Sequence, residues 1–128
     1  MDPITTVVEL PLEAADRAVR AALADHGFGV LTEIDVAAVL KAKLDVDRAP
    51  LRILGACNPT LAHAALRADP RASLLLPCNV VLEPEGDGTR VSAVDPRALL
   101  SDPALADLAQ DAAAALGSAL DSLGGTPS

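Results

Sequence analysis

Aromatic residues are almost absent from this chain. Its 128 residues include one phenylalanine and neither tryptophan nor tyrosine. A packed core must therefore be aliphatic, and the aromatic side chains on which single-stranded nucleic acids stack are missing. Positive charge is also scarce, since 10 Lys and Arg residues stand against 18 Asp and Glu residues, for a net charge of −8. A phosphate backbone would be repelled, so we expect no nucleic-acid partner.

Long apolar runs are lacking as well. Charge or proline interrupts every run well before the roughly 18 residues that a bilayer-spanning helix needs. The start of the chain, residues 1–4, has neither the basic residues nor the apolar stretch of a signal peptide. The sequence therefore predicts no membrane partner and a cytoplasmic location, where thiols stay reduced. Cys57 and Cys78 are then expected to be free, with a disulfide between them as the less favoured alternative.

The chain does have enough apolar residues for one core, because 51% of them are hydrophobic. This content and the length predict a single domain over residues 1–128, with its core at about 4–122. The glycines and proline near the end predict a disordered tail over 123–128.

Apolar periodicity and turn residues divide the chain into strands and helices. Strands are expected over residues 4–10, 28–33, 51–56, 74–83 and 89–94, with a hairpin loop over 84–88. Helices are expected to begin at Pro11, after Asp35, after Asn58 and after Asp102. The order β-α-β-(α)-β-α-β-β-α mixes hairpins with crossovers. It predicts an α+β fold in which helices pack on a largely antiparallel sheet.

Three of these elements carry further signals. The helix after Asp35 has an apolar stripe, formed by Val36, Val39, Leu40 and Leu44. The helix after Asn58 is expected to bury an apolar arc, formed by Leu61, Ala62, Ala65 and Leu66. Within the strand 74–83, Pro77 cannot donate a ladder hydrogen bond, which predicts a bulge or a break beside Cys78.

The most informative segments are Ile53–Pro59 and Leu75–Val80. In each, a cysteine followed by asparagine interrupts an apolar run. Polar groups in such places need partners, so the pattern predicts a site that contains Cys57, Asn58, Cys78 and Asn79. Because the two contexts match, we expect Cys57 and Cys78 to approach each other on neighbouring strands.

These segments also carry a family resemblance. The strings Gly27–Asp35, Arg52–Pro59 and Leu76–Val80, in this order, resemble the domain of unknown function 302 family over roughly residues 4–120. The resemblance implies an α+β fold of the TATA-binding-protein-like type, β-α-β(4)-α, and a homodimer. Family members often carry an aromatic residue where this chain has Arg52. The family supplies no settled activity, so the resemblance predicts a fold and leaves the function open.

Cys57 is the candidate nucleophile. It precedes the expected cap Asn58, and the free N–H groups of a helix start favour a thiolate. The alternative is that Cys57 is a small buried hydrophobe. His63 could act as its base, but it lies on the polar side of its helix, so a solvated histidine is the favoured interpretation.

Glu33 and Asp35 form a second candidate pair. Two residues apart at a strand end, they point to the same side and could bind a hard cation or carry out acid–base work. Asp35 already has a role as a helix cap. A mixed set of Cys57, Cys78, His63 and Glu33 lacks the usual spacing of zinc ligands, so we predict neither a metal nor a cofactor.

Three functions remain open. The favoured one is a dimeric small-molecule binding module with a pocket at the strand ends, between Glu33, Cys57, Asn58 and Cys78. The second is a thiol enzyme or sulfur carrier that uses Cys57 as nucleophile and Cys78 as the second thiol. In the third, the cysteines only fill the core. Weak metal binding is a further alternative, and whether the protein is an enzyme stays open.

Overall fold

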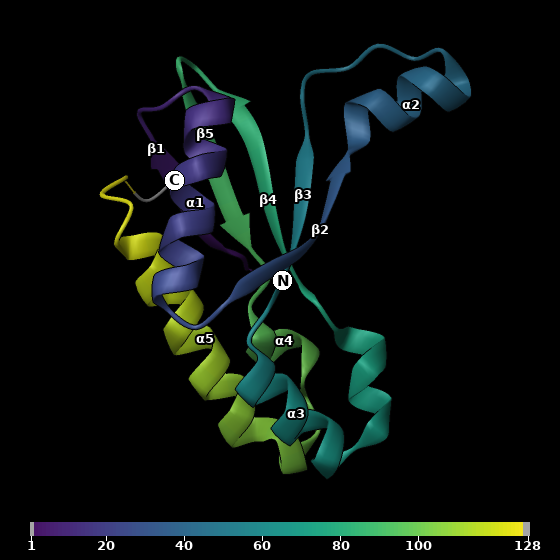
Figure 1. The fold of residues 1–128 in the computed structure, drawn as a ribbon, viewed down its shortest axis with the longest axis vertical. Helices are drawn as coiled ribbons and strands as arrows, with labels where there is room; N and C mark the ends of the chain where they lie inside the picture. The colour runs from purple at the N-terminus through teal and green to yellow at the C-terminus, as the bar shows by residue number, and fades with distance from the viewer. Residues whose placement is uncertain (1, 127–128) are drawn as a thin grey trace.

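A five-stranded antiparallel sheet organises the chain (Figure 1), and the computed structural model describes residues 2–126 of it. The strands are β1 (Ile4–Val8), β2 (Gly29–Asp35), β3 (Arg52–Cys57), β4 (Cys78–Glu85) and β5 (Gly88–Ala93). The helices are α1 (Leu12–Asp25), α2 (Val36–Leu44), α3 (Pro59–Ala68), α4 (Pro96–Leu99) and α5 (Ala106–Asp121), with short 3-10 helices η1 (Pro70–Leu75) and η2 (Pro103–Leu105). The strand order is β1-β5-β4-β3-β2. The predicted α+β class and antiparallel sheet are confirmed.

Helices α1 and α5 cover one face of the sheet (Figure 1). Alternate residues of the strands point toward these helices, because side chains in a strand alternate between its two faces. The fully buried large side chains include Leu54, Val80, Leu82 and Val91 from the strands and Val19, Leu23, Leu116 and Leu120 from the helices. The core is thus aliphatic, as predicted, and Phe28 is its one aromatic member.

A smaller lobe lies beyond the ends of β3 and β4. It is formed by α3, η1, α4 and η2, which pack beside the first half of α5 (Figure 1). Its own apolar cluster consists of Ala65, Ala72, Leu100, Leu105 and Ala109. Each of its four helices starts with a polar side chain that accepts a backbone hydrogen bond and is followed by proline. These caps are Asn58, Asp69, Asp95 and Asp102.

Three sequence predictions about the lobe and the adjacent hairpin are wrong in detail. Residues 70–75 form η1 rather than the start of a strand, because Asp69-Pro70 begins a new helical turn instead of only ending α3. β4 therefore begins at Cys78, directly after Pro77. The hairpin loop is only Gly86-Asp87, since Gly86 takes a φ of 58° that permits a tight turn. Leu66 is exposed on α3, whereas Ala65 is buried.

The two edges of the sheet differ. At the β1 edge, Thr126 pairs with Val7 through two backbone hydrogen bonds of 2.7 and 2.9 Å. Residues 123–126 of the predicted disordered tail are thus placed against the sheet, and 127–128 lie outside the described residues. At the opposite edge lies β2, whose register against β3 shifts between Val30 and Thr32. This irregularity falls in β2 and not at Pro77.

Helix α2 projects away from the rest of the chain (Figure 1). Its cap Asp35 accepts a hydrogen bond from the backbone N–H of Ala38 (2.9 Å), as predicted. The apolar stripe is also present, but α2 contains no buried residue. Nothing within residues 2–126 covers the stripe. Within the same residues, no helix is both long and apolar enough to cross a bilayer.

Candidate functional site

The two cysteines lie side by side where β3 ends and β4 begins. The antiparallel register pairs Ala56 with Cys78, so Cys57 directly follows the residue opposite Cys78. Both cysteines are free thiols and partly buried. Their proximity arises because Asn58 ends β3 and Pro77 precedes β4, so that both strands have their limits at the same level of the sheet.

A cavity of about 30 Å³ opens beside them. It lies between the sheet core and the lobe, since its wall includes Phe28 and Ala56 from the first cluster and Ala65 and Leu100 from the second. The remaining wall residues are Cys57, Asn58, Leu61, Ala62, Leu76, Cys78, Pro96, Leu108 and Ala112. No residue of this wall carries a charge. The cavity is therefore an apolar space whose only polar side chains are two thiols and one amide.

Asn58 is held by its structural role. Its side-chain oxygen accepts a hydrogen bond from the backbone N–H of Leu61 (3.1 Å), which caps α3 as predicted. Its amide nitrogen lies against Gly27, where an added Cβ would approach it to 3.1 Å. Gly27 takes a φ of 87° in the turn between α1 and β2. Asn58 thus joins the start of α3 to that turn and fixes one side of the cavity.

The two thiols differ in their environment. Burial raises the pKa of the Cys78 thiol above its usual value, and the neighbouring Cys57 adds to this effect. A thiol with a raised pKa is mostly protonated at neutral pH and is a poor nucleophile. Cys78 is therefore unsuited to start a thiol reaction in the folded protein.

Alkylation of Cys78 is expected to be slow until the pH is well above the ordinary thiol pKa of about 8.5. The reaction with iodoacetamide should be followed across pH by mass spectrometry of the peptide that contains Cys78. In urea the same peptide should react like an unhindered thiol. The Cys57→Ser variant should quicken the reaction only slightly, because burial is the larger cause. An ordinary alkylation rate at pH 8 in the folded protein would contradict this assignment.

The other predicted site residues lie elsewhere. His63 is exposed on α3 and is absent from the cavity wall. Asn79 is exposed and borders a separate depression with Ser92. Asp35 caps α2, and Glu33 faces arginines of another cluster.

The structure therefore assembles Cys57, Asn58 and Cys78, and it does not bring Glu33, Asp35, His63 or Asn79 to them. The mixed set of two cysteines with His63 and Glu33 is not formed. Within the described chain, no three His, Cys, Asp or Glu side chains are grouped so that they could hold a metal ion.

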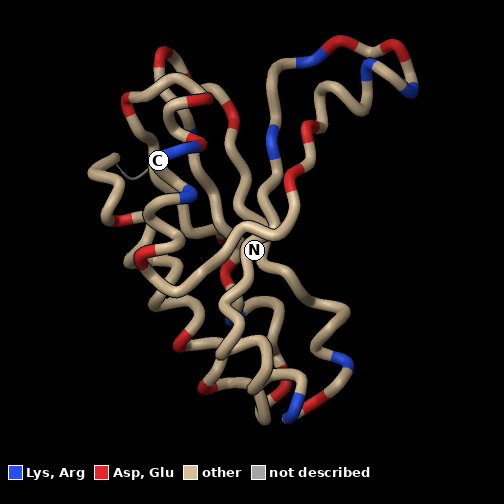
Figure 2. Tube along the Cα trace, in the orientation of Figure 1, with Lys and Arg blue, Asp and Glu red and all other residues tan. Residues whose placement is uncertain are grey.

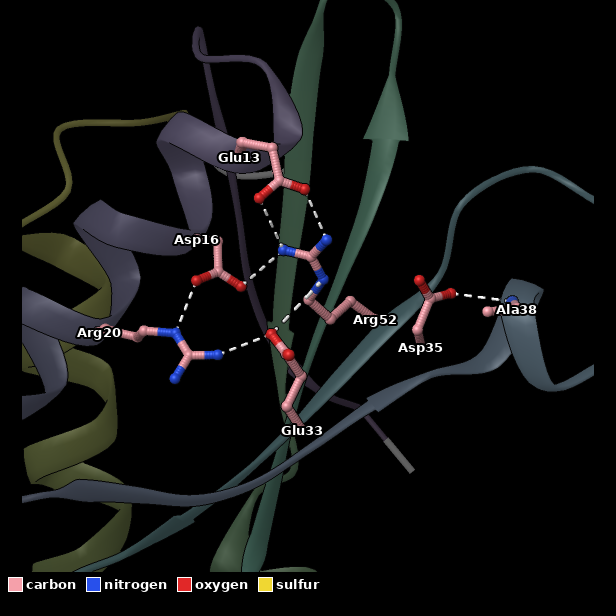
Figure 3. A network of polar contacts seen from close by, with 7 residues as sticks. All are labelled: Glu13, Asp16, Arg20, Glu33, Asp35, Ala38 and Arg52. Atoms are coloured by element: carbon pink, nitrogen blue, oxygen red, sulfur yellow. Dashed lines mark hydrogen bonds and ion pairs between the residues drawn. The ribbon is translucent and has the colours of Figure 1, made fainter.

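A network of five charged side chains joins α1 to β2 and β3 (Figure 3). Arg52 donates hydrogen bonds to Glu13 (2.6 and 3.3 Å) and to Asp16 (2.9 Å). Arg20 donates to Asp16 (2.6 Å) and to Glu33 (2.8 Å). The side chains of Arg52 and Asp16 are only 15% and 9% exposed. Two arginines and three carboxylates thus neutralise one another over the start of β3.

The arginines decide the protonation of this network. Burial of Asp16 opposes its ionisation, but hydrogen bonds from Arg20 and Arg52 outweigh it and lower the pKa of Asp16. The hydrogen bond and charge of Arg52 lower the pKa of Glu13. In return, Glu13 and Asp16 raise the pKa of Arg52. All five groups are therefore charged and paired at neutral pH, and the network is a structural tie with no free acid or base.

Comparison with known proteins agrees with this architecture. The model of the family described as "Domain of unknown function DUF302" matches residues 4–123. The chain belongs to the DUF302 family. A solved relative is the crystal structure of an uncharacterized conserved DUF302 protein from Bacillus stearothermophilus, which is 30% identical to this chain. The match covers 91% of this chain and 94% of that chain, with a TM-score of 0.83. No curated protein matches the chain.

Two residues that matter in this DUF302 chain were not singled out by sequence reasoning. One is Arg52, whose partners Glu13 and Asp16 lie 39 and 36 positions away, so only the i,i+4 pair of Asp16 and Arg20 could have indicated the network. The other is Gly55 in the middle of β3. A Cβ there would meet Oγ1 of Thr32 and would lie 2.8 Å from Cγ of Pro77. An isolated glycine in a strand is the signal of such a close approach.

Proposed function

We propose that this DUF302 protein is a binding module for a small neutral molecule, which occupies the cavity beside Cys57 and Cys78. The observation that carries the proposal is the composition of the wall, in which two thiols and the Asn58 amide are the only polar side chains. Ligand cavities are mainly apolar with a few polar groups that set orientation. The thiols and the amide would supply that orientation.

The wall also limits the ligand. An ionised group would find no opposite charge there, and an unpaired charge in an apolar space is strongly unfavourable. The volume of about 30 Å³ is enough for only a few atoms, because a single water needs about 10–15 Å³ by this measure. A larger ligand would have to separate the lobe from the sheet core. We therefore infer a compact, uncharged and mostly apolar ligand.

The proposal includes a homodimer in the cytoplasm. The exposed apolar stripe of α2 supports self-association, since a soluble chain rarely leaves such a surface uncovered. The free state of both cysteines supports a reducing compartment.

Phe28 offers a direct test of cavity binding. It is the chain's one aromatic residue and it lines the cavity, so the near-ultraviolet circular dichroism of the protein reports on this place. Xenon and dimethyl sulfide are expected to change that spectrum and to stabilise the fold, by about 1.4 kcal/mol at ten times the dissociation constant. Acetate, which is small but charged, should do neither.

Matched variants test whether the cavity is the place of binding. Ala62→Leu fills it and should weaken xenon binding at least tenfold, whereas Leu108→Ala enlarges it and should admit benzene. Ala68→Leu changes the exposed end of the same helix, outside the wall, and should bind like the unchanged protein. Far-ultraviolet spectra check that each variant folds. If neither xenon nor dimethyl sulfide changes the Phe28 spectrum, the binding proposal fails.

A thiol enzyme or sulfur carrier with Cys57 as nucleophile is the second candidate. The observation that favours it is the adjacency of the two thiols, which would let Cys78 act as the second sulfur. Against it, His63 lies outside the wall, so no histidine base accompanies Cys57 there. Serine variants of both cysteines separate the two functions, because a binding cavity tolerates Cys57→Ser and a nucleophile does not.

A further inference from the structure

The surface formed by residues 31–50, which we call the arm, is almost entirely open. It comprises most of β2, all of α2 and the connector to β3. Of its 20 residues, 17 are exposed, three are partly buried and none is buried. Five large aliphatic side chains are exposed on it: Leu31, Ile34, Val39, Leu44 and Val46. Leu31 and Leu44 are 68% and 66% exposed, so the arm is the main apolar surface of the described chain.

Helix α2 needs a cover in the working state of the protein. It has nine residues, and isolated helices shorter than about 12 residues are marginal in water. Most helical stability in proteins comes from packing of the apolar face. Because the described chain packs nothing on the stripe of α2, a partner molecule must do so.

We propose that this partner is a second copy of the chain, which covers the arm through a twofold-symmetric contact. The inference rests on the homodimer proposed above and names its surface. The arm is aliphatic, like the interfaces of permanent homodimers, and it lacks the Trp and Tyr anchors of most transient interfaces. Its 20 residues match the 20–30 residues per side of a standard interface.

Charge favours the same partner. Residues 36–50 hold three basic and two acidic side chains, a net charge of +1, while the rest of the chain carries −9 of the total of −8. The basic positions are visible on the arm in Figure 2. Lys41 is occupied by Asp45 (2.8 Å) and Asp47 (3.2 Å), whereas Lys43 makes no ion pair within residues 2–126. Two copies repel each other over most of their surface, and the arm is where an acidic copy can approach.

The sheet edges make this end of the molecule the available one. Thr126 covers part of the β1 edge through Val7, so the uncovered edge strand is β2. The irregularity at Leu31 and the inward-facing Glu33 are devices that discourage plain edge-to-edge strand pairing. The contact is therefore made by apolar side chains of β2 and α2 and not by a continuous sheet. Symmetry lets the same patch serve both copies.

The test is the molar mass in solution, measured by light scattering across concentration. The unchanged chain is expected at twice its 13.0 kDa at micromolar concentration. Leu31→Asp and Leu44→Asp should each weaken the dimer at least 100-fold, because symmetry places the change twice in the contact. The control is Leu74→Asp, at a leucine that is 83% exposed but lies outside the arm, and it should leave the dimer intact. The Phe28 spectrum checks folding.

The outcomes are distinguishable. A dimer that neither arm variant weakens would overturn the arm as the contact while leaving the homodimer in place. A monomeric unchanged chain would overturn both, and a monomer that sediments with anionic lipid vesicles through the arm would show a membrane as the occupant instead. None of these results bears on xenon binding in the cavity, which tests the binding proposal separately.

Discussion

Replacing Arg52 by alanine is expected to lower the free energy of unfolding by about 3 kcal/mol, which chemical denaturation would measure. The guanidinium is 15% exposed and pairs with Asp16, whose side chain is 9% exposed. Removing it leaves a largely buried carboxylate short of one partner. The expected loss lies at the lower end of the range for a broken buried ion pair, because Arg20 still contacts Asp16.

The pH dependence separates this electrostatic effect from lost packing. Since the pKa of Asp16 is lower in the folded than in the unfolded chain, its ionised form stabilises the fold above the ordinary aspartate pKa of about 3.9. That contribution is lost as the pH falls through the lowered folded-state pKa. The difference between the unchanged protein and Arg52→Ala should therefore be full at pH 7 and shrink below about pH 4.

Two further variants serve as controls. Arg71→Ala removes an arginine that also pairs with an aspartate, Asp69, but is 81% exposed, so little change is expected. Arg52→Met keeps the apolar stem of the side chain and should still be destabilised. If Arg52→Met is as stable as the unchanged protein, the ion pairs contribute nothing and the stem alone accounts for the role of Arg52.

Local signals were enough to predict much of the fold. The caps at Asp35 and Asn58 act through atoms three residues away, so the sequence alone indicates them. The strand limits at Leu74 and Glu83 were wrong because Asp69-Pro70 can either end one helix or begin another. Only the packing of Ala72 into the lobe decides between the two.

The site was predicted where its signal is local and missed where it is not. Cys57 and Cys78 interrupt apolar runs, and the β3–β4 register brings them together. Glu33 was assigned to the same pocket because its structural role was invisible, since that role depends on Arg20 and Arg52 from other elements. The cavity itself is a packing remainder between two clusters, and no pattern of single residues predicts such a space.

Gly55→Ala is expected to destabilise the protein by about 2 kcal/mol, a typical effect of overpacking. The added Cβ would meet the side chains of Thr32 and Pro77. Thr32 can rotate away, but the ring of Pro77 is rigid and lies 2.8 Å from the Cβ position. Displacement of Pro77 would shift the start of β4 and with it Cys78. We therefore expect faster alkylation of Cys78 together with the lower stability.

Gly29→Ala is the matched control, because Gly29 lies on the adjacent strand opposite Cys57 and an added Cβ there meets nothing within 4 Å. It should be neutral or stabilising by about 0.5 kcal/mol, since alanine restricts the unfolded chain. The double variant Thr32→Ala/Gly55→Ala removes the contact with Thr32 and isolates the one with Pro77. If it regains full stability and slow alkylation of Cys78, the clash is with Thr32 alone and Gly55 does not position the thiol. If it stays unstable and reactive, Pro77 transmits the effect, and Gly55 is in β3 so that β4 can begin beside the cavity.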